Sequence, residues 1–310
     1  MSRYIVKRLL YMIPMLFCVI LMIFLIMSLT PGDPASNVLP LTTPQDVKDA
    51  FNERVGFSGS LLTRFGNYMH GLLTGNVLSY TTQENVFTEL ATRFPLTIRV
   101  GTWAFCISAV IGVSLGILSA IKQYSFLDTT VTIFAVTFAS VPSFFVAVLM
   151  ILFFAVYKGW LPSFGIEGFT SYIMPVATLV LANIPILSRM TRSSMLDAMT
   201  QDYIRTARAN GIREGSVKYR HALKNSLIPV ITLVALQVRS MVGGSLLAEQ
   251  VFSIAGMGRL IMTSVMNKDY LTVQATTFVI SLFVVICNFL LDIAYGIVDP
   301  RIRLSAGKRK

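Results

Sequence analysis

Long apolar stretches dominate the chain, and short polar blocks between them contain most of the charged residues. No charged residue occurs in Leu9–Thr30, Val100–Ile121, Thr129–Tyr157 or Leu271–Leu291. A helix needs about 20 apolar residues to cross the hydrocarbon core of a bilayer. We therefore predict an all-α integral membrane protein with six transmembrane helices, at about residues 9–30, 98–121, 130–156, 170–188, 227–249 and 273–296.

The longest connection between predicted crossings, residues 31–97, has a helical pattern of its own. The sequence PGDP at Pro31–Pro34 ends the first crossing, since proline cannot continue a helix. Apolar residues then recur at helical spacing, around 61–73 and again around 86–94. This predicts a small outer helical segment that either orders the connection or meets an external partner.

These patterns divide the chain into four regions. An anchor helix occupies 1–30, and the external helical segment follows at 31–97. A five-helix core occupies 98–300 and includes a polar loop at 189–226, and residues 301–310 form a basic tail.

Composition supports the membrane assignment, and the distribution of charge predicts an orientation. The chain is 54% hydrophobic and 13% charged, whereas soluble proteins are about 25% charged. Most Lys and Arg residues lie before the first crossing, in the 189–226 loop and in the tail. The positive-inside rule places these segments, and hence both termini, in the cytoplasm. The net charge of +11 is therefore a mark of topology rather than of nucleic-acid binding.

Residues that would support catalysis or metal binding are scarce. The chain has no G-x-x-x-x-G-K-[ST] phosphate loop. Its two histidines, His70 and His221, are predicted on opposite sides of the membrane. Cys18, Cys106 and Cys287 each lie in a predicted crossing, at spacings too wide for a metal or redox motif. We predict that the chain is not an enzyme and binds no metal or cofactor.

The polar loop contains a predicted short helix. Thr200 is a candidate N-cap, and Asp202 in the first turn suits the helix dipole. The helix is predicted to end at Asn210, because Gly211 suits the left-handed position that follows a helix C-terminus.

The side chains of this helix fall into two stripes. One holds Tyr203, Thr206, Ala207 and Asn210, and the other holds Asp202, Arg205 and Arg208. Small residues beside a tyrosine and charges form a knob that can enter a groove on a partner. A solvated charged surface is the alternative.

The loop DYIRTARANG followed by HALKN resembles the peptide-transporter form of the EAA loop found in permeases of ABC importers. Only Ala207, Gly211 and Leu223 match the general pattern E-A-A-x3-G-x9-I-x-L-P. Other segments agree with the peptide-type subfamily, namely PGDP, SVPSF at 140–144, RMTRSSMLDAM at 189–199, GGSLLAEQVF at 243–252, GMGRL at 256–260, KDYLTVQ at 268–274 and DPRIR at 299–303. Ala255 and Leu271 stand where the subfamily usually has proline.

The resemblance implies a type I ABC importer permease in a bacterial inner membrane. Its partners would be a second homologous permease, two ABC ATPase subunits that hold ATP and Mg²⁺, and an external substrate-binding protein. The residues implied in coupling to the ATPase are Asp202, Tyr203, Arg205, Thr206, Ala207, Asn210, Gly211 and His221. The implied cargo is a dipeptide or oligopeptide, with nickel or a metal chelate as the alternative within the family. A stand-alone secondary transporter is the alternative from another class.

Four residues are candidates for the substrate path: Arg99, Gln237, Arg239 and Glu249. Arg239 lies eleven residues beyond Ile228, about 16 Å along a helix. A charge at that depth is costly and usually faces a cavity or a partner. Arg239 therefore either attracts an anionic group of the substrate or forms a structural pair. Arg99 either contributes to the entrance or reaches the interface, and Glu249 either lines a gate or binds backbone.

Overall fold

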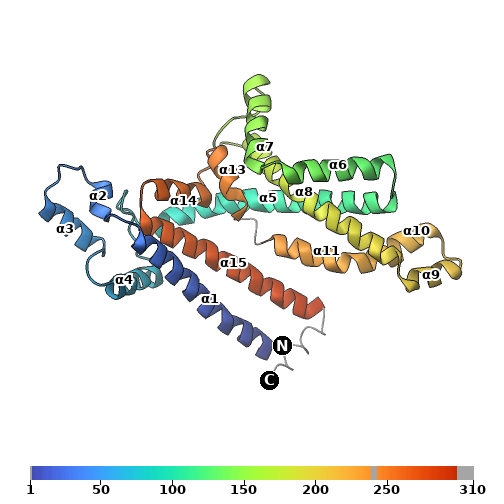
Figure 1. Cartoon of the computed structure of the whole chain (residues 1–310), viewed down its shortest axis with the longest axis horizontal. Coiled ribbons are helices and arrows are strands. Elements are labelled where there is room, and N and C mark those ends of the chain that lie inside the picture. The colour runs from blue at the N-terminus through green and yellow to red at the C-terminus, as the bar shows by residue number, and fades with distance from the viewer. Residues whose placement is uncertain (1, 239–242, 299–310) are drawn as a thin grey trace. The chain divides into compact units, whose positions relative to one another are not determined.

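The computed structural model describes residues 2–238 and 243–298, and its ribbon is shown in Figure 1. Within these residues the regular elements are helices, apart from an isolated antiparallel bridge between Leu78 and Asn85. The chain divides into two compact units, and one of them is built from both ends of the chain. The first combines the residues up to Leu96 with those from Ala255 onward, and the second is Thr97–Ile254.

The first unit contains a pair of long apolar helices and the helices of the outer segment. Its elements are α1 (Ser2–Leu29), α2 (Pro34–Val38), α3 (Gln45–Arg54), α4 (Leu61–Thr74), the start of α5 (Val86–Ile121), α14 (Met257–Met266) and α15 (Tyr270–Val298). The predicted break at PGDP is confirmed, and Asp33 has a role there as the N-cap of α2. Its carboxylate accepts a hydrogen bond of 2.6 Å from the backbone N–H of Ser36.

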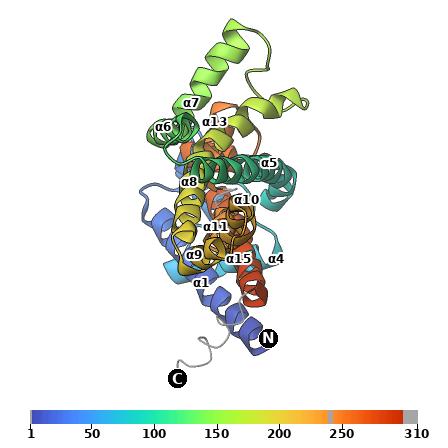
Figure 2. The ribbon, with the colours of Figure 1, turned by 90° about the vertical axis from the view of Figure 1, so that its right-hand side faces the viewer.

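Helices α1 and α15 lie side by side in both ribbon views (Figures 1 and 2). Near one end of the pair, the guanidinium of Arg8 lies 2.7 Å from the carboxylate of Asp292. Near the other end, a buried cluster that includes Ile20, Phe24, Tyr68 and Leu72 packs α1 against α4. The outer segment is thus part of the hydrophobic core of its unit rather than a loose connection.

Asp269 fastens the turn at 79–81 to the start of α15. Its buried carboxylate accepts hydrogen bonds of 2.8 Å from the hydroxyls of Thr81 and Thr272, and one of 3.1 Å from the backbone N–H of Tyr80. Several donors on one carboxylate compensate for its removal from water.

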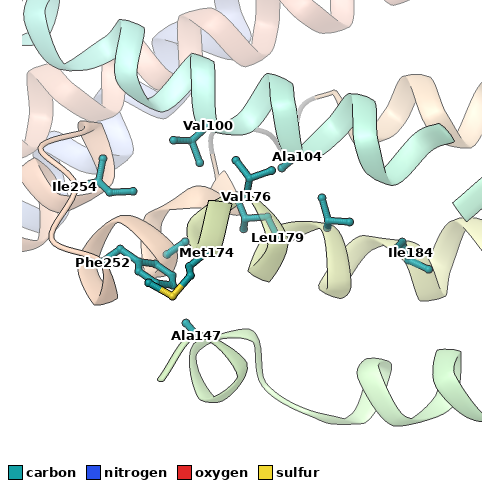
Figure 3. Close-up of a cluster of buried hydrophobic side chains, with 11 residues drawn as sticks. Val100, Ala104, Ala147, Met174, Val176, Leu179, Ile184, Phe252 and Ile254 are labelled. Carbon is teal, nitrogen blue, oxygen red and sulfur yellow. The ribbon is translucent and has the colours of Figure 1, made fainter. Parts of the chain in front are cut away.

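The second unit is built around α8. Its elements are the rest of α5, α6 (Phe126–Ser140), α7 (Ser143–Met150), the π-helix η1 (Ile151–Tyr157), α8 (Thr170–Met199), α9 (Asp202–Ala209), α10 (Glu214–Ser216), the π-helix η2 (Val217–Ala222), α11 (Leu223–Gln237) and α13 (Ser245–Val251). Helices α6, α7, α11 and α13 all pack against α8. A core of buried apolar side chains joins α8 to α5, α7 and the end of α13 (Figure 3).

The third predicted crossing is not one straight helix, which corrects the prediction for 130–156. Helices α6 and α7 meet at Val141 and Pro142 with a bend of 100°. Val141 has an extended backbone, with φ −92° and ψ 126°. The ring of Pro142 disfavours the helical conformation of the residue before it, so an unbroken apolar run can still contain a sharp corner.

Four helices of the described residues are long and apolar enough to cross a membrane, and the bent pair would make five. The four are Arg8–Leu29, Val86–Ile121, Thr170–Met199 and Tyr270–Ile293. They correspond to the first, second, fourth and sixth predicted crossings. The fifth prediction, 227–249, includes residues 239–242, which lie outside the described part.

Two glycines allow α5 and α8 to approach closely. A Cβ atom at Gly112 would lie 2.7 Å from the Cβ of Leu187. A Cβ atom at Gly116 would lie 2.5 Å from the Cβ of Thr191 and 2.6 Å from the carbonyl oxygen of Ser188. This is the small-xxx-small spacing by which helices pack closely in membranes.

Candidate functional site

The helix predicted in the polar loop is α9, which lies with α10 beyond the C-terminal end of α8 (Figures 1 and 2). The predicted N-cap residue of α9 needs a correction. Gln201, rather than Thr200, is the N-cap residue, and its side chain makes no capping bond. The hydroxyl of Thr200 instead donates to the carbonyl of Asp197, 2.8 Å away, so Thr200 ends α8.

The C-terminal prediction is confirmed. Asn210 follows the last helical residue, and Gly211 has a φ of +75°. A residue with a Cβ is strained in this left-handed conformation, which glycine adopts readily. The chain then turns back, and the N–H of Ile212 donates to the carbonyl of Ala207 over 3.2 Å.

The inner face of α9 seals a small apolar core under the loop. Ile204 is fully buried and Ala207 is almost so, packed in a cluster with Ala120, Met195, Ala198, Val217 and Ala222. Ala207 therefore belongs to the inward face, which corrects the prediction that it shares a protruding stripe. At this position a small side chain lets α9 lie close to its neighbours.

The outer face of α9 is polar and exposed. It presents Asp202, Tyr203, Arg205, Thr206 and Asn210, followed by Gly211. Arg205 and Asp202 lie 3.5 Å apart with 77% and 95% of their side chains exposed, so their attraction is weak. Half-exposed His221 lies in η2 rather than on α9.

An ion pair holds the turn after α9. The guanidinium of Arg208 donates to both carboxylate oxygens of Glu214, over 3.1 and 2.9 Å. Hydrogen bonding to Arg208 lowers the pKa of Glu214. The pair ties α9 to α10 across Gly211, and sequence reasoning included neither residue among the coupling candidates.

A second, better shielded pair joins α6 to α8, the helix that leads into the loop. In the first turn of α6, Asp128 has only 6% of its side chain exposed, and it pairs with Arg192 of α8 over 2.7 and 2.8 Å. The hydroxyl of Ser119 on α5 and the backbone N–H of Tyr124 also donate to this carboxylate. We call these residues the Asp128 clamp. Sequence reasoning missed it, and the lone acidic residue before a long uncharged run is the signal that could have indicated it.

The second unit also contains a small cavity of about 150 Å³. Its lining includes Gln237 and the hydrogen-bonding residues Ser108, Ser143, Asn183 and Ser245. Gln237 thus lines a cavity, and its place on a substrate path stays a prediction. Glu249 lies one turn after Ser245 on α13, is fully buried and accepts a hydrogen bond of 3.1 Å from Ser245.

The other two path candidates are placed differently. Arg99 is exposed on α5 and does not belong to the cavity lining. Arg239 lies outside the described residues. The described residues of the cavity lining are uncharged, and the polar ones among them can form hydrogen bonds with a polar solute.

Two family models cover most of the chain. Residues 112–304 match the family described as binding-protein-dependent transport system inner membrane component. Residues 1–101 match the N-terminal region of a membrane component of such systems. The second of these regions contains residues 31–97, so the helices of that segment are part of the family pattern.

Relatives that match over nearly their whole length are also named as components of transport systems. The glutathione transport system permease protein GsiC of Escherichia coli strain K12 is 34% identical over 304 residues, which cover 98% of this chain and 99% of that protein. The protein of the same name from Pectobacterium atrosepticum is 35% identical with the same coverage.

Solved structures show the fold. A chain of the MetNI methionine ABC transporter in an inward-facing conformation matches with a TM-score of 0.59 at 19% identity, over 70% of this chain and 99% of that one. A chain of an amino acid ABC transporter matches with a TM-score of 0.56 at 12% identity, over 67% of this chain and 92% of that one. The predicted fold, an all-α membrane permease of the type I ABC importer class, is confirmed.

Proposed function

This chain belongs to the family of binding-protein-dependent transport system inner membrane components, and we propose that α9 is the contact through which a partner ATPase moves it. The chain is a multi-pass permease subunit of an ABC importer. An import permease without a nucleotide site of its own needs a surface that receives the movement produced by ATP hydrolysis. The partners in this proposal are a second permease of the family, two ATPase subunits with ATP and Mg²⁺, and an external binding protein.

One observation carries the assignment to α9: a short helix with an exposed polar face is held rigidly by a buried apolar face. Ile204 anchors the helix with no exposed surface, and Tyr203 beside it is 39% exposed. A helix held in this way moves together with the ends of α5 and α8 on which it is packed. The Asp128 clamp then ties those ends to α6, so a push on α9 reaches three helices of the unit.

Replacing Tyr203 with Ala tests the docking role. Buried tyrosines are frequent hot spots of protein interfaces, so we expect about tenfold weaker association with the ATPase. The measurement is the binding of purified ATPase to the permease in nanodiscs. Tyr219→Ala is the matched control, because Tyr219 is 56% exposed in the same loop but lies in η2. Equal effects of the two substitutions, or none, would refute docking through α9.

The proposal also requires α9 and the outer segment to lie on opposite sides of the membrane, with both termini cytoplasmic. A single cysteine can be placed at Arg205 or at Leu62, which is 81% exposed on α4, after Cys18, Cys106 and Cys287 are replaced. We expect a membrane-impermeant maleimide to label Leu62→Cys in spheroplasts and Arg205→Cys only in inside-out vesicles. Labelling of Arg205→Cys from outside would reverse the topology and remove the docking role.

We propose short peptides as the cargo. The relatives named as glutathione permeases support this class, and the serine and asparagine side chains that line the cavity with Gln237 suit the amide groups of a peptide. In this proposal Gln237 contacts the cargo directly. Glu249 acts indirectly, because it accepts a hydrogen bond from Ser245, which lines the same cavity.

Arg239 is proposed to attract a carboxylate of the cargo, on the sequence argument that a charge deep in an apolar span serves a function. Arg239→Ala is expected to lower peptide uptake into proteoliposomes about tenfold, the loss typical of a charged hydrogen bond. ATP hydrolysis should persist, because α9 is unchanged. Arg99→Ala is the control, since Arg99 is exposed and does not line the cavity. Unchanged uptake by Arg239→Ala would exclude the substrate role.

A further inference from the structure

The outer segment contains a cavity that the proposed transport path does not use. It has a volume of about 420 Å³ and lies entirely within the first unit. The outer end of α1, helices α3 and α4, the turn at 76–83 and the start of α15 form its walls. Pockets for small ligands have volumes of about 300–1,000 Å³. The cavity therefore has the size of a small-molecule site.

Four polar atoms in the walls of this cavity have no hydrogen-bond partner among the described residues. They are the phenolic oxygens of Tyr68 and Tyr270 and the amide oxygens of Gln83 and Gln274. Tyr68, Tyr270 and Gln274 are only 5%, 6% and 4% exposed. Buried polar groups are nearly always paired, because an unpaired one loses its bonds to water without replacement. Four such atoms around one cavity indicate that a polar ligand is the missing partner.

The amide oxygen of Gln83 cannot easily find a partner elsewhere. The amide nitrogen of the same side chain donates to the carbonyls of Ser79 and Tyr80, over 3.3 and 3.0 Å, which fixes the orientation of the group. Gln83 also has a φ of +58°, in the left-handed region. Such strained residues are concentrated at ligand-binding and catalytic sites.

A cation without a counter-ion lines the same cavity. The guanidinium of Arg64 stacks on the ring of Phe57, 3.7 Å from its centroid. No carboxylate of the described residues lies within ion-pairing distance of it. Burial lowers the pKa of Arg64, as expected for a charge that is partly removed from water. A guanidinium binds a carboxylate through two parallel hydrogen bonds, so the cavity favours an anionic group at this end.

We propose that this cavity binds a free amino acid or a dipeptide as a zwitterion. The carboxylate pairs with Arg64, and the ammonium or amide N–H groups donate to the oxygens of Gln83 and Gln274. The hydroxyls of Tyr68 and Tyr270 complete the hydrogen bonding of either end. This is a binding site of the outer segment, and it depends neither on docking through α9 nor on the cargo of the transport path.

The test is calorimetric titration of the full-length permease in nanodiscs with glycylglycine. Saturable binding to the unmodified chain is expected. Arg64→Gln should weaken it about tenfold, and Tyr270→Phe about fivefold, since each removes one partner of the ligand. Tyr219→Phe is the matched control, because it removes an exposed hydroxyl from the other unit and should leave binding unchanged. Glycinamide, which lacks the carboxylate, should bind as weakly to the unmodified chain as glycylglycine binds to Arg64→Gln.

A second readout separates ligand contact from a structural role of the tyrosines. The hydroxyls of Tyr68 and Tyr270 have no hydrogen-bond partner among the described residues, so Tyr68→Phe and Tyr270→Phe should keep or raise the melting temperature while they weaken binding. Lowered melting temperatures would show that the hydroxyls serve the fold, and would overturn the proposal. Absence of glycylglycine binding, which would mean that water alone fills the cavity, would also overturn it. So would equally tight binding of inorganic phosphate, which would indicate a simple anion site.

Discussion

Replacing Gly116 with Leu is expected to prevent α5 from packing on α8, and with it the folding of the second unit. Even the single methyl group of Ala would lie 2.6 Å from the backbone oxygen of Ser188, which no change of rotamer can relieve. Overpacking of a tight core costs about 1–3 kcal/mol. We therefore expect Gly116→Ala to lose about this much free energy of unfolding, and Gly116→Leu to yield no monodisperse protein in detergent.

Gly66 provides the control for this substitution. It also lies inside a helix, α4, but a Cβ atom there would meet nothing within 4 Å. Alanine is the better helix former by up to about 1 kcal/mol, so Gly66→Ala should match or exceed the stability of the unmodified chain. Thermal unfolding followed by size-exclusion chromatography measures both variants. If Gly116→Ala melted at the temperature of the unmodified chain, the close approach of α5 and α8 would be refuted.

The sequence predicted the apolar helices well because their signal is local. An uncharged run long enough to cross a bilayer can be recognised without knowing its neighbours, as in Arg8–Leu29 and Tyr270–Ile293. The corner at Val141–Pro142 was missed because apolar content does not change there, and only the ring of the proline interrupts the helix. The spacing of Gly112 and Gly116 was visible, but Leu187 and Thr191, the residues that require it, each lie 75 positions further along the chain.

In the site, too, features set by neighbouring residues were predicted and those set by distant residues were not. The position of α9 and the left-handed Gly211 follow from nearby residues, so both were predicted. Helical periodicity placed Ala207 near the exposed stripe, but the packing of Ala120 and Met195 determines which side of the helix is covered. The Asp128 clamp could not be predicted as a pair, because its two charges are 64 residues apart and meet only when α6 packs on α8.

The position of this clamp suggests why a membrane protein would retain a shielded ion pair. A buried pair stabilises little compared with apolar residues of equal volume, but breaking one is costly because it strands a charge. Asp128 accepts from α5, from the α5–α6 turn and from α8. It therefore holds three elements in one arrangement beside the core under α9. Such a pair contributes rigidity between the proposed docking surface on α9 and the membrane helices more than it contributes net stability.

Arg192→Ala is accordingly expected to have the second large effect. It leaves the carboxylate of Asp128 buried without its cation, which should lower the free energy of unfolding by about 3 kcal/mol. Asp128→Ala should cost less, since Arg192 is 29% exposed and can reach water. Because the partners interact directly, the double variant should lose less stability than the sum of the single variants. Additive losses in denaturant unfolding would mean that the pair has no coupling energy.

A transport measurement distinguishes a role of the Asp128 clamp in transmitting movement from a role in stabilising the fold. If the clamp transmits movement from α9, Arg192→Lys should bind the ATPase normally yet import fewer peptides per ATP hydrolysed, because lysine cannot form the paired hydrogen bonds of a guanidinium. Arg189→Ala is the matched control, three residues earlier on α8, where the side chain is exposed and donates to the carbonyl of Pro185. Transport per ATP in proteoliposomes decides the question. An unchanged ratio in Arg192→Lys, at unchanged ATPase binding, would confine the clamp to a role in folding.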